Sequence, residues 1–199
     1  MSRWFHDSKA ADVVSIDDRA FQYGDGLFET VAIRSGEPRL WNYHLDRLTM
    51  GCERLQIAVP DVQVLRKQLD HAVANSGESP ARCAAKIVVS SGVSARGYAR
   101  VTPTSARTYI GVFATTPVAT DFYRDGVATR VCDTRLALFS ATAGLKTLNR
   151  LEQVLARSEC AADSAFEGLT LDARARLICG TMSNVFIVSN QTITTPSLH

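Results

Sequence analysis

Lys146 is the residue of this sequence most suited to covalent chemistry. It lies in the stretch GLKTLNRLEQVLAR, just before a segment with an apolar face. A lysine at the start of a helix is commonly solvated. A buried lysine has a lowered pKa, and its free lone pair can form a Schiff base with a carbonyl compound. The spacing alone leaves both interpretations open.

Arginines recur on a helix that the hydrophobic pattern predicts at residues 42–55. Arg47 and Arg54 lie seven residues apart and share a face, and His44 lies one turn before Arg47. The sequence alone favours a solvated face for these side chains. An arginine that points into a cleft would instead bind a phosphate through its forked N–H donors.

Three further segments place polar groups in turns or loops. Residues 17–30 contain GDG, which reads as a tight turn into a strand and is a weak signal for a phosphate-binding loop. Arg96 and Tyr98 flank a glycine in the Gly-, Ser- and Thr-rich loop 90–105, where they would suit a substrate carboxylate or only line a surface. Residues 179–184, CGTMSN, would admit a ligand to the backbone or form a plain turn.

Composition and motifs argue against several other classes of protein. The 199 residues are 46% apolar and 21% charged with a net charge of +2, which is typical of a globular chain and does not favour nucleic-acid binding. The five cysteines are widely spaced without a CxxC, the four histidines are scattered, and GxSxG and HExxH are missing. No apolar run or leader pattern indicates a membrane or secreted protein. We expect a cytoplasmic protein without metal, nucleic-acid or membrane partners.

The elements that must position these residues are short strands and a few amphipathic helices. The pattern predicts helices at residues 42–55, 62–74 and 149–160, with Asn42 as the N-cap of the first. It predicts strands at residues 27–33, 86–89, 109–113, 127–132, 168–171, 184–188 and 192–195. Because strands outnumber helices and the two are segregated, we expect an α+β fold.

The chain is predicted to form two domains. Residues 115–123, TTPVATDFY, are the best candidate for an interdomain linker. They would separate a small N-terminal α+β domain at 1–114 from part of a larger C-terminal domain at 124–199. The sequence ends at His199 in a strand-like run with no closing helix. We therefore expect the second domain to be incomplete, although a chain that simply stops there is the alternative.

Five motifs, taken in order, resemble those of the fold-type IV enzymes, which use pyridoxal 5′-phosphate (PLP). They are DRAFQYGDGLFET, YHLDRL, SARGY, GLKTLNRLEQVLAR and SNVFIVSN. Within this group, the stretch GLKTLNRLEQVLAR is most similar to the aminodeoxychorismate lyases. The resemblance runs from about Asp17 to the end of the chain and implies a two-domain fold-type IV architecture.

The resemblance implies cofactor-binding residues. Lys146 matches the lysine that holds PLP covalently, and Arg47 matches the arginine that binds its phosphate. Cys179 and Asn184 match cofactor-binding positions of the second domain.

The resemblance also implies a substrate site. Arg96 and Tyr98 match a loop that reaches the substrate carboxylate near a dimer interface, and Phe28 matches an aromatic residue that lines the active site. A homodimer is therefore expected.

The implied reaction converts 4-amino-4-deoxychorismate into 4-aminobenzoate and pyruvate, in folate biosynthesis. The cofactor would act as the electron sink, and Lys146 would take a proton from the amine-bearing carbon. Two alternatives stay open. One is a D-amino-acid or branched-chain aminotransferase of the same fold, and the other is a truncated remnant that has lost its cofactor.

Two features depart from the family pattern. Cys179 stands where the family offers a glutamate to the pyridine nitrogen, and a thiol near its ordinary pKa is a poor partner for a pyridinium. We expect this loss to harm an aminotransferase more than a lyase. The family also continues beyond the position of His199, so we expect a chain that ends there to bind PLP poorly.

Overall fold

The structure is a computed structural model that describes residues 3–100, 104–138 and 141–197. Residues 101–103 of the predicted loop 90–105 lie outside the described residues. His199 does so too, and with it the expectation about the end of the second domain. The chain divides into two compact units, Met1–Thr116 with Leu145–Asn149, and Pro117–Gly144 with Arg150–His199. The linker and domain bounds stay a prediction, but the units differ from them by assigning Leu145–Asn149 to the first unit.

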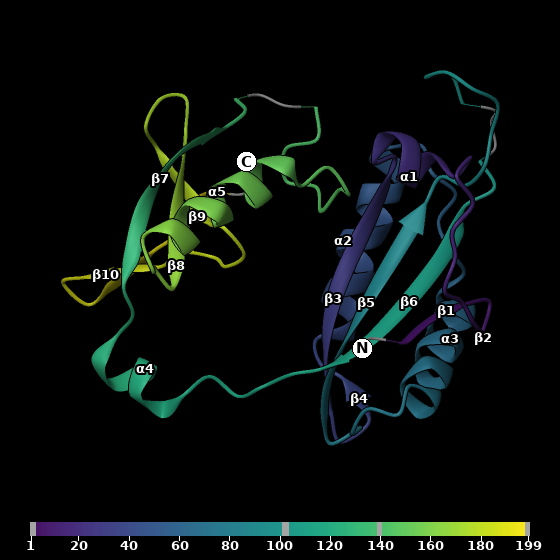
Figure 1. The fold of residues 1–199 in the computed structure, drawn as a ribbon, viewed down its shortest axis with the longest axis horizontal. Coiled ribbons are helices and arrows are strands. Elements are labelled where there is room, and N and C mark those ends of the chain that lie inside the picture. The colour runs from purple at the N-terminus through teal and green to yellow at the C-terminus, as the bar shows by residue number, and fades with distance from the viewer. Residues whose placement is uncertain (1–2, 101–103, 139–140, 198–199) are drawn as a thin grey trace. The chain divides into compact units, whose positions relative to one another are not determined.

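The first unit is built on a six-stranded antiparallel sheet in the order β2-β1-β6-β5-β3-β4 (Figure 1). Its strands are β1 (Arg3–His6), β2 (Lys9–Ala10), β3 (Gly26–Arg34), β4 (Glu37–Pro38), β5 (Arg82–Ser90) and β6 (Arg107–Ala114). The predicted strands at 27–33, 86–89 and 109–113 are confirmed and are longer than predicted. The short strands β1, β2 and β4 were not predicted.

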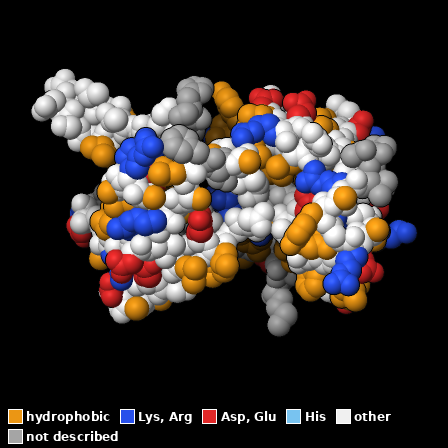
Figure 2. All heavy atoms as spheres, turned by 90° about the horizontal axis from the view of Figure 1, so that it is seen from above, with side chains coloured by type: hydrophobic (Ala, Val, Ile, Leu, Met, Phe, Trp, Pro, Cys, Tyr) orange, Lys and Arg blue, Asp and Glu red, His pale blue; other side chains and the backbone are white. Residues whose placement is uncertain are grey.

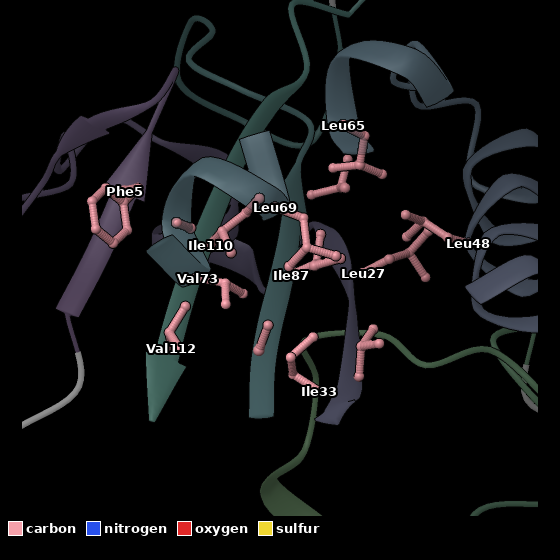
Figure 3. Close-up of a cluster of buried hydrophobic side chains, with 14 of the residues drawn as sticks. Phe5, Leu27, Ile33, Leu48, Leu65, Leu69, Val73, Ile87, Ile110 and Val112 are labelled. Atoms are coloured by element: carbon pink, nitrogen blue, oxygen red, sulfur yellow. The ribbon is translucent and has the colours of Figure 1, made fainter. Parts of the chain in front are cut away.

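Helices α2 (Trp41–Arg54) and α3 (Val62–Asn75) cover one face of this sheet. Alternate residues of the central strands point to them, which buries a continuous apolar core (Figure 3). The prediction of Asn42 as an N-cap is wrong, because α2 begins at Trp41 after Leu40. Trp41 packs against the core and so becomes part of the first turn. A short helix, α1 (Arg19–Tyr23), precedes β3.

The second unit contains a three-stranded sheet, a helix and a hairpin. Its elements are α4 (Thr120–Asp125), β7 (Thr129–Leu136), α5 (Leu151–Ala162), β8 (Glu167–Asp172), β9 (Leu177–Gly180), β10 (Ile187–Ser189) and β11 (Thr192–Thr194). Strands β7 and β8 are parallel and are connected through α5, which packs on both. A small core of Cys132, Ala156 and Cys160 lies between helix and sheet. Burial raises the pKa of Cys132 to about 11, as expected for a thiol among apolar groups.

The predicted elements of the second unit occur with shifted ends, and the strand predicted at 184–188 begins only at Ile187. Strand β9 was not predicted, and it includes Cys179 and Gly180 of the segment 179–184, for which a turn was one interpretation.

Helix α5 begins at Leu151 and not at residue 149, and Asn149 instead donates a hydrogen bond to the carbonyl of Gly24 at 3.2 Å within the first unit. Helix α4 begins inside the segment 115–123 that was predicted as a linker and ends two residues beyond it.

The architecture of the described residues is α+β, as predicted. None of their helices combines the length and the apolar character needed to cross a membrane. On the face shown in Figure 2, basic and acidic side chains are interspersed with hydrophobic ones.

Candidate active site

Lys146 is held against the sheet of the first unit by its backbone. The amide of Phe28 donates to the carbonyl of Lys146 at 2.9 Å, and the amide of Leu148 donates to the carbonyl of Gly26 at 3.0 Å. The segment thus pairs with the N-terminal end of β3, through an antiparallel bridge between Leu27 and Thr147. Lys146 is not a solvated residue of a helix start, because the backbone here is extended and helix α5 begins five residues later.

The amine of Lys146 lies over an aromatic ring. Its Nζ is 4.1 Å from the centroid of the Phe28 ring, and the residue is half-buried. A second amine, Lys86 Nζ of β5, lies 4.7 Å from the same centroid. Lys86 pairs with Thr30 across the strands, and alternate residues share a face, so Phe28, Thr30 and Lys86 point to the side of the sheet away from the helices. The site prediction omitted Lys86, which the alternation of β5 would have placed beside Phe28.

Arg47 is oriented by a buried carboxylate. Arg47 Nε and Nη2 donate to the two oxygens of Glu29, each at 2.6 Å, and His44 Nδ1 lies 2.7 Å from Glu29 Oε2. The side chain of Glu29 is 1% exposed, whereas that of Arg47 is 46% exposed. Burial alone would raise the pKa of Glu29, but the hydrogen bonds and charges of Arg47 and His44 lower it. Arg47 is therefore a half-exposed side chain at the edge of the core, and its orientation is fixed by Glu29.

Phe28 and Glu29 are successive residues of β3, so their side chains leave opposite faces of the strand. Lys146 contacts the first of them and Arg47 contacts the second. The sequence did not single out Glu29 or foresee this arrangement. A signal was present, since Glu29 occupies a core-facing position between Leu27 and Val31.

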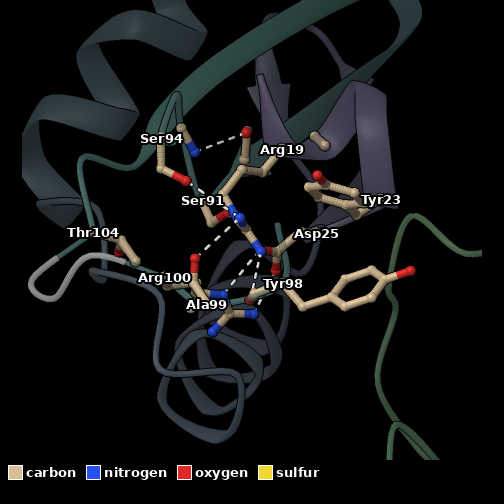
Figure 4. Close-up of polar contacts among 12 residues, drawn as sticks. Arg19, Tyr23, Asp25, Ser91, Ser94, Tyr98, Ala99, Arg100 and Thr104 are labelled. Atoms are coloured by element: carbon tan, nitrogen blue, oxygen red, sulfur yellow. Dashed lines mark hydrogen bonds and ion pairs between the residues drawn. The ribbon is translucent and has the colours of Figure 1, made fainter. Parts of the chain in front are cut away.

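Arg96 and Tyr98 lie on a loop of the same unit. Both are exposed, and the side chain of Tyr98 is directed away from the polar cluster that holds the loop backbone (Figure 4). One edge of its ring packs against Tyr23, with ring centroids 5.5 Å apart. Both side chains are accessible to a ligand, as their predicted role requires.

Cys179 and Asn184 belong to the second unit. Cys179 is a half-buried residue of β9, and Thr170 Oγ1 donates to its carbonyl at 2.9 Å and lies 3.3 Å from its Sγ. Asn184 is exposed and follows a turn in which the Gly180 amide donates to the Ser183 carbonyl at 2.8 Å.

A buried carboxylate that the sequence pattern did not indicate holds this turn. Glu167 accepts hydrogen bonds from the Gly168 amide at 2.9 Å, the Thr181 amide at 3.1 Å and Ser183 Oγ at 2.8 Å, and also from Thr181 Oγ1. Burial opposes ionisation, but these donors lower the pKa of Glu167.

Each unit brings its own set of functional groups together. Within the first unit, the described residues include an amine seated on an aromatic ring, an oriented guanidinium, and an exposed cation and phenol on a fixed loop. Within the second, they include a half-buried thiol beside a turn that a buried carboxylate holds.

Comparison with known proteins identifies the family. Residues 26–199 match the model of the amino-transferase class IV family. An aminodeoxychorismate lyase of Vibrio harveyi is 34% identical over 185 residues, which are 93% of this chain and 67% of that protein. An aminodeoxychorismate lyase of Bacillus subtilis (strain 168) is 28% identical over 188 residues, which are 94% of this chain and 63% of that protein.

A solved structure supports the same assignment. The 4-amino-4-deoxychorismate lyase of Pseudomonas aeruginosa has a TM-score of 0.83 and 39% identity, and the match covers 98% of this chain and 70% of that one. This chain thus spans about two thirds of the length of the curated relatives. The resemblance inferred from the five motifs is confirmed. The chain belongs to the class IV aminotransferase family and has its fold-type IV architecture.

Proposed function

We propose that this chain carries the cofactor lysine of a PLP-dependent aminodeoxychorismate lyase, which converts 4-amino-4-deoxychorismate into 4-aminobenzoate and pyruvate for folate synthesis. The observation that carries the proposal is the seating of Lys146, with its backbone paired to β3 and its amine on the Phe28 ring. The names of the relatives in Vibrio harveyi and Bacillus subtilis support the choice of reaction. The homodimer and the cytoplasmic location stay predictions.

The residues of the first unit fit PLP chemically. Lys146 offers a primary amine for the aldehyde carbon of the cofactor, and the Phe28 ring covers part of that amine. Arg47 offers a guanidinium for the phosphate. Glu29 occupies its Nε and Nη2, while Nη1 has no hydrogen-bond partner among the described residues. The fixed fork therefore retains donors for an anion and loses little rotamer freedom on binding one.

When bound, PLP supplies an electron sink for cleavage of the substrate. Lys146 would then act as the base that removes the proton from the carbon bearing the substrate amine. Departure of the enolpyruvyl group, released as pyruvate, leaves an aromatic ring. Because aromatisation makes the step downhill, the position of the Lys146 amine matters more than its strength as a base.

Cys179 favours the lyase over an aminotransferase. An aminotransferase must stabilise a carbanion long enough to reprotonate it elsewhere, and a thiol in place of a glutamate weakens the electron sink. In a lyase the leaving group removes the electron pair at once. The experiments must therefore distinguish the lyase from two alternatives, an aminotransferase and a remnant that has lost its cofactor.

The lysine is tested by borohydride reduction of the chain with limiting PLP, followed by peptide mapping. We expect the pyridoxyl group on Lys146, and we expect Lys146→Ala to lose it. Lys86→Ala is the matched control, because Lys86 Nζ lies over the same ring at 4.7 Å but Lys86 belongs to the central strand β5 and not to the segment around Lys146. Labelling of Lys86, or of no lysine in the two units, would contradict the proposal.

The reaction is tested with two substrates offered separately. Aminodeoxychorismate should give fluorescent 4-aminobenzoate, and D-alanine with 2-oxoglutarate should give no product. The reverse result would favour the aminotransferase. A chain that folds but neither takes a pyridoxyl label nor turns over either substrate would favour the remnant.

A further inference from the structure

The backbone of the loop that carries Arg96 and Tyr98 is bound by one buried arginine. Arg19, at the start of α1, is 4% exposed. Its Nη1 donates to the carbonyl of Gly97 at 2.8 Å, and its Nη2 donates to the carbonyl of Tyr98 at 3.0 Å. Nη1 also reaches Ser94 Oγ at 3.2 Å. One guanidinium thus binds the backbone on the C-terminal side of Arg96 (Figure 4).

The guanidinium is itself fixed by a carboxylate. Arg19 Nε donates to Asp25 Oδ2 at 2.8 Å, and Asp25 also accepts from Ser91 Oγ at 2.8 Å and from Arg100. Burial alone would raise the pKa of Asp25, but the hydrogen bonds from Arg100, Arg19 and Ser91 lower it. Asp25 therefore stays ionised at neutral pH and bridges the two arginines.

Tyr23 completes the support from the other end of α1. Its hydroxyl accepts a hydrogen bond from the Gly97 amide at 3.2 Å, and its ring lies 4.9 Å from the Arg19 guanidinium carbon. The same ring packs against Tyr98. The amide and the carbonyl of Gly97 are thus both hydrogen-bonded to side chains of α1. The backbone conformation held in this way, with φ of +108°, is one that favours glycine.

The base of the loop is fixed to the same helix. Asp18, the N-cap of α1, accepts from the Ala20 amide at 2.9 Å and from Ser90 Oγ. The Arg19 amide donates to the Gly92 carbonyl at 2.9 Å. The DRAFQYGDG motif therefore builds a platform beneath residues 94–99. The side chain of Tyr98 contacts this platform through the Tyr23 ring, whereas the exposed side chain of Arg96 has no hydrogen-bond partner among its described residues.

We propose that Arg19, assisted by Tyr23, is the positioning residue of the substrate loop: it fixes the backbone of residues 94–99 so that Arg96 and Tyr98 are presented to the carboxylate of the substrate. This rests on the proposed function. A guanidinium suits the task because its planar fork reaches several carbonyls at once from one fixed position, which an ammonium group does not. The loop is thereby preorganised, and little ordering is left to occur on binding.

The experiment compares Arg19→Met, Arg19→Lys and Tyr23→Phe with the control Arg66→Met. Arg66 is also an ion-paired arginine of the first unit, but it lies on the surface of α3 with Asp70 and Glu37. Tyr23→Phe keeps the ring and removes only the acceptor for Gly97, so it should fold even if Arg19→Met does not. Tryptophan fluorescence checks folding in each variant.

The first measurement is limited trypsin cleavage after Arg96, followed by mass spectrometry. Cleavage requires the local backbone to open, so its rate reports the open population. We expect Arg19→Met to accelerate it about tenfold or more, with smaller increases in Arg19→Lys and Tyr23→Phe and no change in Arg66→Met. Equal rates in folded Arg19 and Tyr23 variants and in the unaltered chain would overturn the proposal.

The second measurement separates KM from kcat for aminodeoxychorismate. If the loop binds the substrate and the transition state equally well, loss of its support should weaken both. We then expect KM to rise about tenfold to a hundredfold, with a smaller change in kcat. The PLP label on Lys146 should persist. Faster cleavage with an unchanged KM would overturn the positioning role. If the unaltered chain turns over no substrate but Arg19→Met is still cleaved faster, the proposed function fails while the support of the loop by Arg19 stands.

Discussion

Replacing the buried carboxylate of Glu29 tests whether it fixes Arg47 and stabilises the first unit. Glu29→Gln keeps the volume but removes the charge that faces Arg47 and His44, and it turns an amide N–H₂ toward their donors. Breaking a buried ion pair by removing one partner costs about 3–5 kcal/mol. The half-exposed Arg47 can be solvated after the change, which reduces the cost, so we expect a loss of about 2–3 kcal/mol in the free energy of unfolding.

The assay is urea unfolding followed by tryptophan fluorescence. Trp4 and Trp41 are the two tryptophans of the chain, and both lie in the first unit, so the signal reports the unit that contains Glu29. Glu37→Gln is the matched control, because Glu37 is also paired with an arginine but its side chain is 72% exposed. It should cost less than about 0.5 kcal/mol.

The pH dependence gives an independent check with a defined sign. The pKa of Glu29 is lowered by folding, so its ion pair stabilises the first unit fully above the ordinary value of 4.5, and this contribution is lost as the pH falls below it. The unaltered chain should therefore lose more stability below pH 4.5 than Glu29→Gln does. Equal losses in Glu29→Gln and Glu37→Gln at neutral pH, together with parallel acid profiles, would refute the reasoning.

Two further substitutions test the local packing. Gly24→Ala should lower the free energy of unfolding by about 2 kcal/mol, because φ at Gly24 is +64° and the new Cβ would lie only 2.9 Å from Cγ of Asn149. Gly36→Ala should lower it by about 1 kcal/mol, because φ is +81° but the space around the new Cβ is open. Equal costs, measured by the same unfolding assay, would argue against the Asn149 contact. A thiol reagent should modify Cys179 first under native conditions, because the other four cysteines are buried. Cys179→Ser should remove the fast phase, and a fast phase that survives would contradict the burial described.

The family and the central elements of the first unit could be predicted from the sequence. Local patterning is enough for β3 and α3, because alternation in one and helical spacing in the other match the face that each buries. The short strands β1 and β4 could not be predicted, since two- and four-residue strands are defined by their partners across the sheet and not by their own composition. The N-cap of α2 was misplaced for a related reason, because packing of Trp41 on the core overrode the local preference of Asn42.

The candidate site also has a part that the sequence indicates and a part that only the tertiary structure shows. The sequence singled out Lys146, Arg47, Arg96 and Tyr98 as candidates, since their motifs are local and resemble those of the family, and their roles stay predictions. Only the tertiary structure showed what holds them: Glu29 beneath Arg47, and Arg19 beneath the loop of Arg96 and Tyr98. These supporting residues contact partners 18 and 78 positions away along the chain. Such contacts arise only when strands and loops that are distant in sequence pack together. The strand pattern could place Glu29 on the core face, but no local pattern could show which partner Glu29 or Arg19 contacts.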